Sequence, residues 1–378
     1  MENTPGANAP VLRERIDSLD ALRGFDMFWI TGGEGIFHAL APLTGWSLFI
    51  WMSKQLGHVP WNGFHFYDMI FPLFLFIAGI SMPFSLSRRL EKGNTRRQVY
   101  MHIFKRMILL VFLGMIYNGL LEFDWQNMRY ASVLARIGLG WFFAALIFMN
   151  TTRKTQYFWF AGILVVYWLI MTFVPVPGVG AGILTREGSL AGYIDRMLLP
   201  GRLYLGDHDP EGILSTFPAI ATALMGVLTG QFLKDPNPSL SPMKKGMYLA
   251  AAGITALIIG YLWGLFFPIN KNLWTSSFVL FAGGWSLILL SVFYIIMDVW
   301  KLKKWAFFFI VIGLNPITIY LCDRGVLALR STSDFFLGGL ITHYFPLTWH
   351  DLLQAIGFSA AGWIFLYLLY RKKIFLKV

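Results

Sequence analysis

The sequence predicts an all-α, polytopic membrane protein with about ten transmembrane helices and both termini in the cytoplasm. Of its 378 residues, 56% are hydrophobic and only 13% are charged, roughly half the charged fraction of an average soluble protein. The mean hydropathy is +0.59. Ten apolar runs each come near the ~20 residues that a helix needs to cross a bilayer.

These ten runs organise the chain into one membrane domain, residues 19–370, between an amino-terminal tail, residues 1–18, and a carboxy-terminal tail, residues 371–378. The first tail has no apolar core, so we expect no cleavable signal peptide. The expected spans are residues 19–40, 66–88, 102–121, 130–150, 156–176, 211–232, 247–267, 274–297, 304–322 and 352–370.

Three details refine these spans. Charged residues, among them Asp20 and Glu34, interrupt the first span, and Asn315-Pro316 breaks the ninth. Pro210 is expected in the first turn of the sixth span, with Asp209 as its cap. The segment 323–350 is too short in its apolar part to span, which is typical of a re-entrant or interfacial segment.

The distribution of Lys and Arg predicts the orientation. Nineteen of these residues fall on the side of the amino terminus and eight on the other. Since cytoplasmic loops are enriched in positive charge, both termini should be cytoplasmic. The net charge of +11 follows from this asymmetry and from contact with anionic membrane lipids, and it gives no support for a nucleic-acid partner.

A polar stretch, residues 57–68, lies between the first two expected spans and therefore on the outer face. It carries His58, Asn62, His65 and Asp68, and its proline and glycine prevent a continuous helix. Such a concentration of ionisable groups beside a membrane span favours a site of acid–base or nucleophilic chemistry. A loop histidine that is merely solvated is the plainer alternative.

Other classes receive less support. The sequence has no nucleophile elbow, no Walker loop and no zinc-ligand spacing, so we expect no metal. A secondary transporter would also show about ten spans, intramembrane charges and broken helices. Against a transporter, we find no inverted repeat, and the polar residues gather at the outer rim instead of the midplane.

Ordered polar blocks along nearly the whole chain resemble the heparan-α-glucosaminide N-acetyltransferase family. They are Ser18-Leu19-Asp20-Ala21-Leu22-Arg23-Gly24, His58, Trp61-Asn62-Gly63, Asp68, Phe71-Pro72, Arg129, Arg136-Ile137-Gly138, Ala191 to Arg196, Asp209 to Leu214, Asn270 to Trp274 and Arg371 to Phe375. One family asparagine before a glycine cluster has no clean counterpart near Thr31-Gly32-Gly33-Glu34. The chain looks like a bacterial member, which implies the inner membrane.

This resemblance implies transfer of acetyl from cytoplasmic acetyl-CoA to the amine of a glucosamine-type sugar on the outer face, without a metal, and suggests a homodimer. His58 then acts as general base or as acetyl carrier, and both routes stay open. Asp68 or Glu34 orients its imidazole, and Asn62 and Asn270 are candidate donors to the oxyanion. O-acetylation of a cell-envelope glycan is the alternative reaction.

The remaining candidate residues would bind the two substrates. Trp61, Asp195, Asp209, Glu211 and Asn270 are expected at the sugar, and Arg23 and Arg136 at the CoA phosphates. Each charged group has a structural alternative. Asp20, Arg23 and Asp26 have the spacing of a helical ion pair, Arg136 is equally suited to neutralise a neighbouring helix, and Asp209 and Glu211 suit a helix start.

Overall fold

The computed structural model describes residues 16–322 and 329–376, which form an all-helical fold without a named strand in these ranges. The α-helices are α1 (Asp17–Phe28), α2 (Glu34–Thr44), α3 (Ser47–Gln55), α4 (Ile70–Glu91), α5 (Arg96–Tyr117), α6 (Val133–Asn150), α7 (Arg153–Phe173), α8 (Leu190–Leu198), α9 (Ile213–Lys234), α10 (Pro242–Gly264), α11 (Ser276–Tyr294), α12 (Phe307–Gly313), α13 (Pro316–Leu321), α14 (Leu329–Ser333), α15 (Gly339–Tyr344) and α16 (His350–Arg371).

Short 3-10 and π-helical turns join or extend them. These are η1 (Trp29–Gly33), η2 (Phe66–Met69), η3 (Leu120–Glu122), η4 (Ile295–Val299), η5 (Lys304–Ala306), η7 (Asp334–Gly338) and η8 (Leu347–Trp349).

Eight helical segments in the described residues are long and apolar enough to cross a membrane. They contain α4, α5, α6, α7, α9, α10, α11 and α16, and they correspond to eight of the ten expected spans. The prediction of an all-α polytopic membrane protein is therefore confirmed. The tail residues 1–15 and 377–378 and the segment 323–328 lie outside the described residues.

The other two expected spans are broken helices. Within residues 19–40, α1 ends and η1 turns the chain at Gly32, whose φ of +114° favours glycine. A Cβ at Gly32 would also lie 2.7 Å from the Phe358 ring. Within residues 304–322, α12 stops before Asn315 and α13 starts at Pro316, as the Asn-Pro pair predicts.

The centre of the fold is the pair α4 and α9, which run in the same direction, and glycines bring their backbones together. A Cβ on Gly79 would lie 2.1 Å from the Ala223 carbonyl oxygen, and one on Gly226 would lie 2.1 Å from that of Phe76. Small residues allow this close approach between membrane helices, where packing and not water exclusion drives association. The pair fixes the relative positions of the two loops that precede it in the chain.

The loops form two groups at opposite ends of this bundle. At what we call the basic end, Arg153 pairs with Asp235 at 3.2 Å and Lys303 with Asp17 at 2.6 Å. At the His58 end, the Gly63 amide donates to the Ile269 carbonyl at 2.9 Å. The Lys and Arg pattern predicts this grouping of the loops, while the assignment of the basic end to the cytoplasm stays a prediction.

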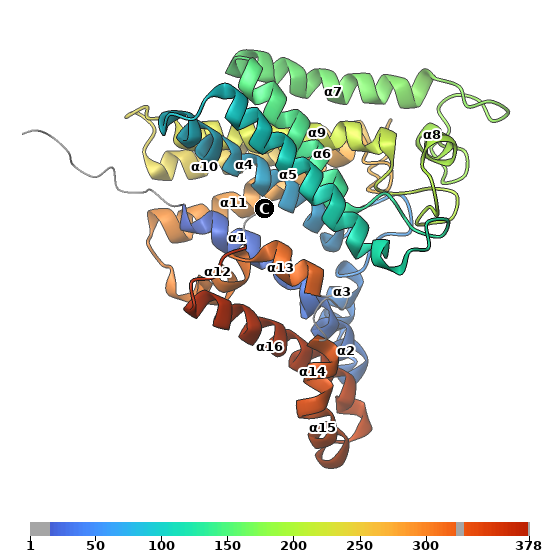
Figure 1. The fold of residues 1–378 in the computed structure, drawn as a ribbon, viewed down its shortest axis with the longest axis vertical. Helices are drawn as coiled ribbons and strands as arrows, with labels where there is room; N and C mark the ends of the chain where they lie inside the picture. The colour runs from blue at the N-terminus through green and yellow to red at the C-terminus, as the bar shows by residue number, and fades with distance from the viewer. Residues whose placement is uncertain (1–15, 323–328, 377–378) are drawn as a thin grey trace, which may run out of the picture.

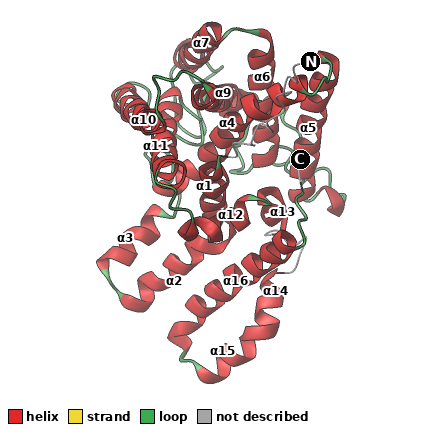
Figure 2. Ribbon diagram, turned by 90° about the vertical axis from the view of Figure 1, so that its left-hand side faces the viewer, coloured by secondary structure: helices red, strands yellow, loops and turns green. Residues whose placement is uncertain are grey.

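Figure 1 shows that α7 flanks the bundle on one side and that α2, α14 and α15 extend from the other. Figure 2 shows α2 and α3 as a hairpin next to α14–α15 and α16. Large apolar side chains are exposed in these parts of the fold, such as Trp46 between α2 and α3, Phe158 of α7 and Phe335 of η7. Exposed aromatic and aliphatic surface of this kind suits contact with membrane lipid.

Candidate functional site

The loop that carries His58 is held by its own backbone and by the loop between α10 and α11. His65 Nδ1 lies 2.9 Å from the Gly57 carbonyl oxygen, so this second histidine closes the loop on itself. Gly63 adopts φ +122°, which glycine tolerates, and its amide bonds to Ile269. The result is a compact turn that brings the two ends of the polar stretch together.

His58 and Asp68 form a hydrogen-bonded dyad at the start of α4. The His58 Nδ1 and Asp68 Oδ1 atoms are 2.8 Å apart, and the carboxylate is buried while the imidazole is half exposed. Asp68 Oδ2 also accepts the His65 amide at 3.0 Å. Because a carboxylate only accepts, Nδ1 carries the hydrogen and Nε2 keeps a lone pair for chemistry.

Lys271, from the α10–α11 loop, is the third member of this site and was not among the predicted site residues. Its Nζ lies 2.9 Å from His58 Nε2 and 3.8 Å from Asp68 Oδ1. Burial lowers the pKa of Lys271, and the charges of Asp68 and Glu211 oppose this effect. The sequence feature that could have identified Lys271 as a site residue is its position in the polar block Asn270-Lys271-Asn272.

Asn62 and Asn270 contact one another. Asn270 Nδ2 donates to Asn62 Oδ1 at 2.9 Å, and Asn270 Oδ1 accepts the Leu273 amide at 2.8 Å. Both ends of the buried Asn270 side chain are thus engaged in holding the two loops together. Its geometry is that of a loop brace, and the Asn62 amide nitrogen makes no hydrogen bond within the described chain.

The three carboxylates expected at the sugar lie together near the start of α9, but each has an intramolecular partner. Arg129 binds Asp209 with two hydrogen bonds, of 2.8 and 2.6 Å, and also binds Glu211. Asp195 accepts the Ile213 amide at 2.9 Å. Asp195 therefore caps α9 from α8, and the prediction that Asp209 caps a helix beginning at Pro210 is wrong.

The pKa values of Asp195 and Asp209 are shifted in opposite directions by their surroundings. Burial raises the pKa of Asp195 to about 6. Burial acts in the same direction on Asp209, but the Arg129 guanidinium outweighs it and holds the pKa of Asp209 below its usual value. Asp195 is thus the carboxyl of this group that can exchange a proton near neutral pH.

Trp61 and His208 connect the His58 loop with the long loop before α9. The Trp61 indole donates to the Leu184 carbonyl at 2.8 Å, and its ring meets the His208 ring edge-on at 5.3 Å. His208 is buried, which lowers its pKa. Glu34 begins α2 directly after η1, and among the described residues Asp68, not Glu34, contacts His58.

The two arginines expected at the CoA phosphates lie among different neighbours. Arg136 is buried near the start of α6, donates to Ser215 and sits 4.8 Å from the Trp274 ring centre. Arg23 in α1 pairs with Asp20 at 3.0 Å and donates to Ser81 of α4 at 3.2 Å. Arg136 lies near the His58 end, where its charge acts on Lys271, whereas Arg23 contacts α4 at Ser81, further along the bundle.

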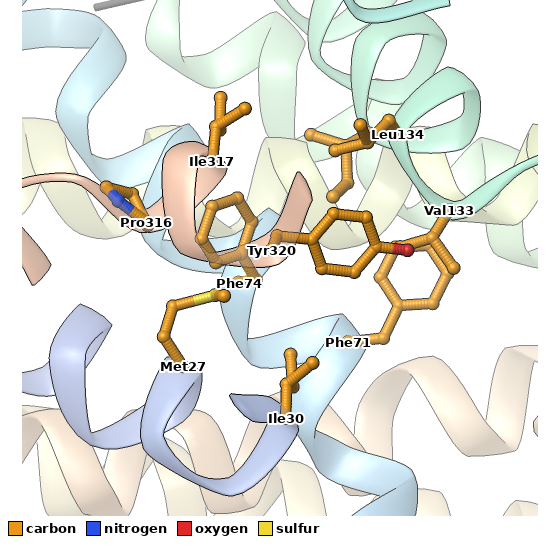
Figure 3. Close-up of a pocket in the computed structure, with 10 residues that line it drawn as sticks. Met27, Ile30, Phe71, Phe74, Val133, Leu134, Pro316, Ile317 and Tyr320 are labelled. Carbon is orange, nitrogen blue, oxygen red and sulfur yellow. The ribbon is translucent and has the colours of Figure 1, made fainter. Parts of the chain in front are cut away.

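A small apolar cavity of about 30 Å³ lies within the helical bundle. Figure 3 shows side chains from η1, α4, α6 and α13 around it, with Tyr320 and Phe71 among them. Phe71 follows Asp68 by three residues, so both lie on one face of the same helical segment. One lining residue of the cavity thus lies one helical turn from the dyad carboxylate.

The fold and the dyad define a polytopic helical membrane protein with a candidate acid–base site at one end. A family model described as "Domain of unknown function (DUF5009)" matches residues 15–125. The chain is 29% identical to the human heparan-alpha-glucosaminide N-acetyltransferase over 434 residues and 28% identical to the Mus musculus protein over 385. Together these matches support membership of the heparan-α-glucosaminide N-acetyltransferase family.

The coverage of these alignments is unequal. They include 97% of this chain with the human relative and 85% with the mouse relative, but only 60% and 56% of the relatives themselves. The chain thus spans less than two thirds of the length of the curated relatives that it matches. The resemblance found in the sequence blocks and these alignments point to the same family.

Proposed function

We propose that the protein is an acetyl-CoA-dependent transmembrane acetyltransferase that acetylates the amine of a glucosamine-type sugar. The observation that carries the proposal is the His58–Asp68 dyad, with a 2.8 Å hydrogen bond, at the start of a membrane-spanning helix. The similarity to two proteins named heparan-alpha-glucosaminide N-acetyltransferase supports the choice of reaction.

In this proposal His58 Nε2 takes the proton from the sugar amine as the nitrogen attacks the thioester carbonyl. The tetrahedral intermediate then expels the CoA thiolate, which leaves with the proton returned by His58. The alternative route forms an acetyl-imidazole first and transfers acetyl to the amine second. Asp68 has the same role in both routes, because it fixes the tautomer of His58 and stabilises its positively charged form.

The remaining site residues take supporting roles. Asn62 offers an amide nitrogen to the oxyanion, while Asn270 orients Asn62. Trp61 offers an aromatic surface to the sugar, and Glu211 lies on the loop beside it. The basic end faces the cytoplasm of a bacterial inner membrane and the His58 end faces outward, so that donor and acceptor enter from opposite sides.

The experiment that tests the proposal uses purified protein in lipid nanodiscs with acetyl-CoA labelled in the acetyl group. We expect labelled product with glucosamine and none with N-acetylglucosamine, whose amine is blocked while its hydroxyls are free. Transfer to N-acetylglucosamine would identify an O-acetyltransferase. Solute uptake into proteoliposomes without transfer to either sugar would identify a transporter.

A second prediction concerns Lys271. Its Nζ lies 2.9 Å from His58 Nε2 and 3.8 Å from Asp68 Oδ1, so the lysine contacts both members of the dyad. In Lys271→Met the Asp68 carboxylate and the Tyr67 ring still contact His58. The imidazole loses one contact that positions it, and we expect kcat/KM to fall about tenfold, the cost of a lost hydrogen bond to a charged group.

Two variants control for indirect effects of this change. Lys271→Arg keeps the charge and should lose less activity than Lys271→Met. Lys54→Met removes an exposed lysine of α3, near the same end of the bundle, and should leave kcat/KM unchanged. A lower melting temperature in Lys271→Met that accounts for the lost activity would assign the lysine a purely structural role.

A further inference from the structure

Asp26 of α1 is a buried carboxyl group that the proposed mechanism does not use. Its side chain is 0% exposed, and neither of its carboxylate oxygens has a hydrogen-bond partner in the described chain. Because a carboxylate has about four acceptor positions, its burial without partners is costly. Within a membrane bundle, such an acid usually marks an ion pathway or a proton relay.

The charged surroundings of Asp26 are sparse. Arg23, one turn earlier on α1, is the group whose charge acts on Asp26, but it pairs with Asp20 at 3.0 Å. α12 and η1, which pack against α1, contain no ionisable residue. The ionisable residues of the other elements that contact α1 are Tyr67 and Asp68 of η2, Arg88, Arg89 and Glu91 of α4, Tyr294 of α11, Asp298 of η4 and Tyr320 of α13.

These surroundings suit a proton and not a metal ion as the ligand of Asp26. A metal cation needs several more oxygen ligands than one carboxylate supplies. Among the described residues there is no group of three His, Cys, Asp or Glu side chains that could hold one. A proton needs only the carboxylate itself.

Aromatic side chains place Asp26 beside the His58 loop. The Phe66 ring meets the rings of Phe25 and Trp29 at 6.3 and 5.5 Å. These two residues precede and follow Asp26 on the chain, and Phe66 belongs to η2, the turn that carries the dyad carboxylate. Trp29 Nε1 is likewise buried and makes no hydrogen bond within the ranges that the structure describes. A buried acceptor and a buried donor thus lie one turn apart, and such groups are typical partners of internal water, which can pass a proton.

Toward the basic end, acidic residues continue along α1 at a spacing of three. Asp17, Asp20 and Asp26, here called the acidic series, occupy these positions, with Arg23 between the last two. Residues three apart are neighbours on a helix surface. Exposure rises along the series, from 0% at Asp26 to 15% at Asp20 and 31% at Asp17. At about 1.5 Å per residue, the series covers roughly 13 Å and leads from the His58 loop to the basic end.

Acetylation of an amine leaves one proton to be removed. An aliphatic amine is an ammonium at neutral pH and carries three protons on its nitrogen. As the N–C bond forms and the C–S bond breaks, one proton stays in the amide and a second passes through His58 to the CoA thiolate. The third proton must leave the site in every turnover, and it needs an acceptor other than His58.

We propose that Asp26 binds this third proton and that the acidic series conducts it to the basic end. With the basic end in the cytoplasm, acetyl moves outward while one proton moves inward, so each turnover carries one positive charge through the bundle. A membrane potential that is negative inside therefore accelerates transfer. This inference rests on the proposed function, and it names the side of the membrane on which the proton is released.

The test measures initial rates in proteoliposomes that enclose acetyl-CoA and receive glucosamine outside, so that only molecules with the basic end inward turn over. A potassium gradient with valinomycin sets the potential. At about 100 mV, negative inside, wild-type turnover should be at least about threefold faster than without a potential, because a charge that crosses part of the membrane gains this much. An enclosed pH indicator should record one proton released inside for each acetyl transferred.

Asp26→Asn keeps the size of the side chain and removes the proton-binding group. We expect its turnover to fall about tenfold, less than for a group at the reacting atoms, and the remaining turnover to be independent of the potential. Its proton should appear outside the vesicles. Asp351→Asn removes an exposed carboxyl from the first turn of α16 and should change neither the rate nor its dependence on potential.

Wild-type turnover that ignores the potential, or that releases its proton only outside, would overturn the proton path. A slower Asp26→Asn that responds to the potential as the wild type does would show that Asp26 only supports the fold. Proton binding is also measurable without turnover, as an infrared carboxyl band that changes with pH in the wild type and is missing from Asp26→Asn; the lack of such a band would refute the site. Wild-type protein with this band but without acetyl transfer would contradict the proposed function and leave the proton site standing.

Discussion

His58→Ala is expected to lose at least about a hundredfold in turnover while the protein still folds and still binds CoA. A positioned acid–base group contributes about 10²- to 10⁴-fold to a rate, and in either proposed route His58 is that group. Folding should survive because Asp68 keeps the His65 amide at 3.0 Å and Lys271 at 3.8 Å. The measurement is single-turnover transfer from labelled acetyl-CoA to glucosamine.

His65→Ala is the matched control, since it removes the other imidazole of the same loop. His65 contacts the Gly57 carbonyl and not the dyad carboxylate with its side chain, so we expect a loss of less than about tenfold. Acetyl trapped on wild-type protein and absent from His58→Ala would select the covalent route. Near-normal transfer in His58→Ala together with inactive His65→Ala would refute the assignment of the base.

The dyad illustrates what local sequence can predict. His58 and Asp68 lie within one short stretch, and the proline and glycine between them indicate a turn instead of a helix. The sequence left Asp68 and Glu34 as alternatives for orienting the imidazole. The structure gives that contact to Asp68 because the loop folds back onto the first turn before α4, whereas Glu34 follows the bend at Gly32.

The spans and their two-sided charge were predictable for a similar reason. Hydropathy and Lys or Arg placement are properties of continuous segments, and the eight candidate spans follow from them. The first expected span shows the limit of prediction from continuous segments. Its bend depends on Gly32 fitting against Phe358 of α16, a contact between distant parts of the chain that no local pattern reports.

Long-range pairing also explains the residues that sequence reasoning missed or placed differently. Lys271 reaches His58 across 213 positions, and Arg129 reaches Asp209 across 80. A block such as Asn270-Lys271-Asn272 can attract attention in sequence, but the partner of each side chain is fixed only by packing. Hence Asp209 was expected at a helix cap and instead lies in a buried ion pair.

That ion pair leads to the expectation of a large loss of stability in Arg129→Met. The change leaves Asp209 and Glu211 without their shared guanidinium, and these two carboxylates are 0% and 8% exposed. Removing one partner of a buried ion pair costs about 3–5 kcal/mol, because the remaining charge has no compensation. The melting temperature in detergent should fall by roughly 5–10 °C.

The pH dependence of this loss distinguishes the ion pair from mere side-chain packing. In the wild type Arg129 holds the pKa of Asp209 below its usual value, so the stabilisation is present above that value and is lost as the pH falls. In Arg129→Met burial raises the pKa of Asp209 instead, and the variant loses stability as the pH rises through the raised value. The difference in melting temperature should therefore be larger at pH 8 than at pH 5.

Arg186→Met breaks the more exposed pair with Asp207 and should cost less than about 1 kcal/mol. Equal losses in both variants, or a loss independent of pH, would show that the Arg129 pair stabilises the fold no more than a surface contact does.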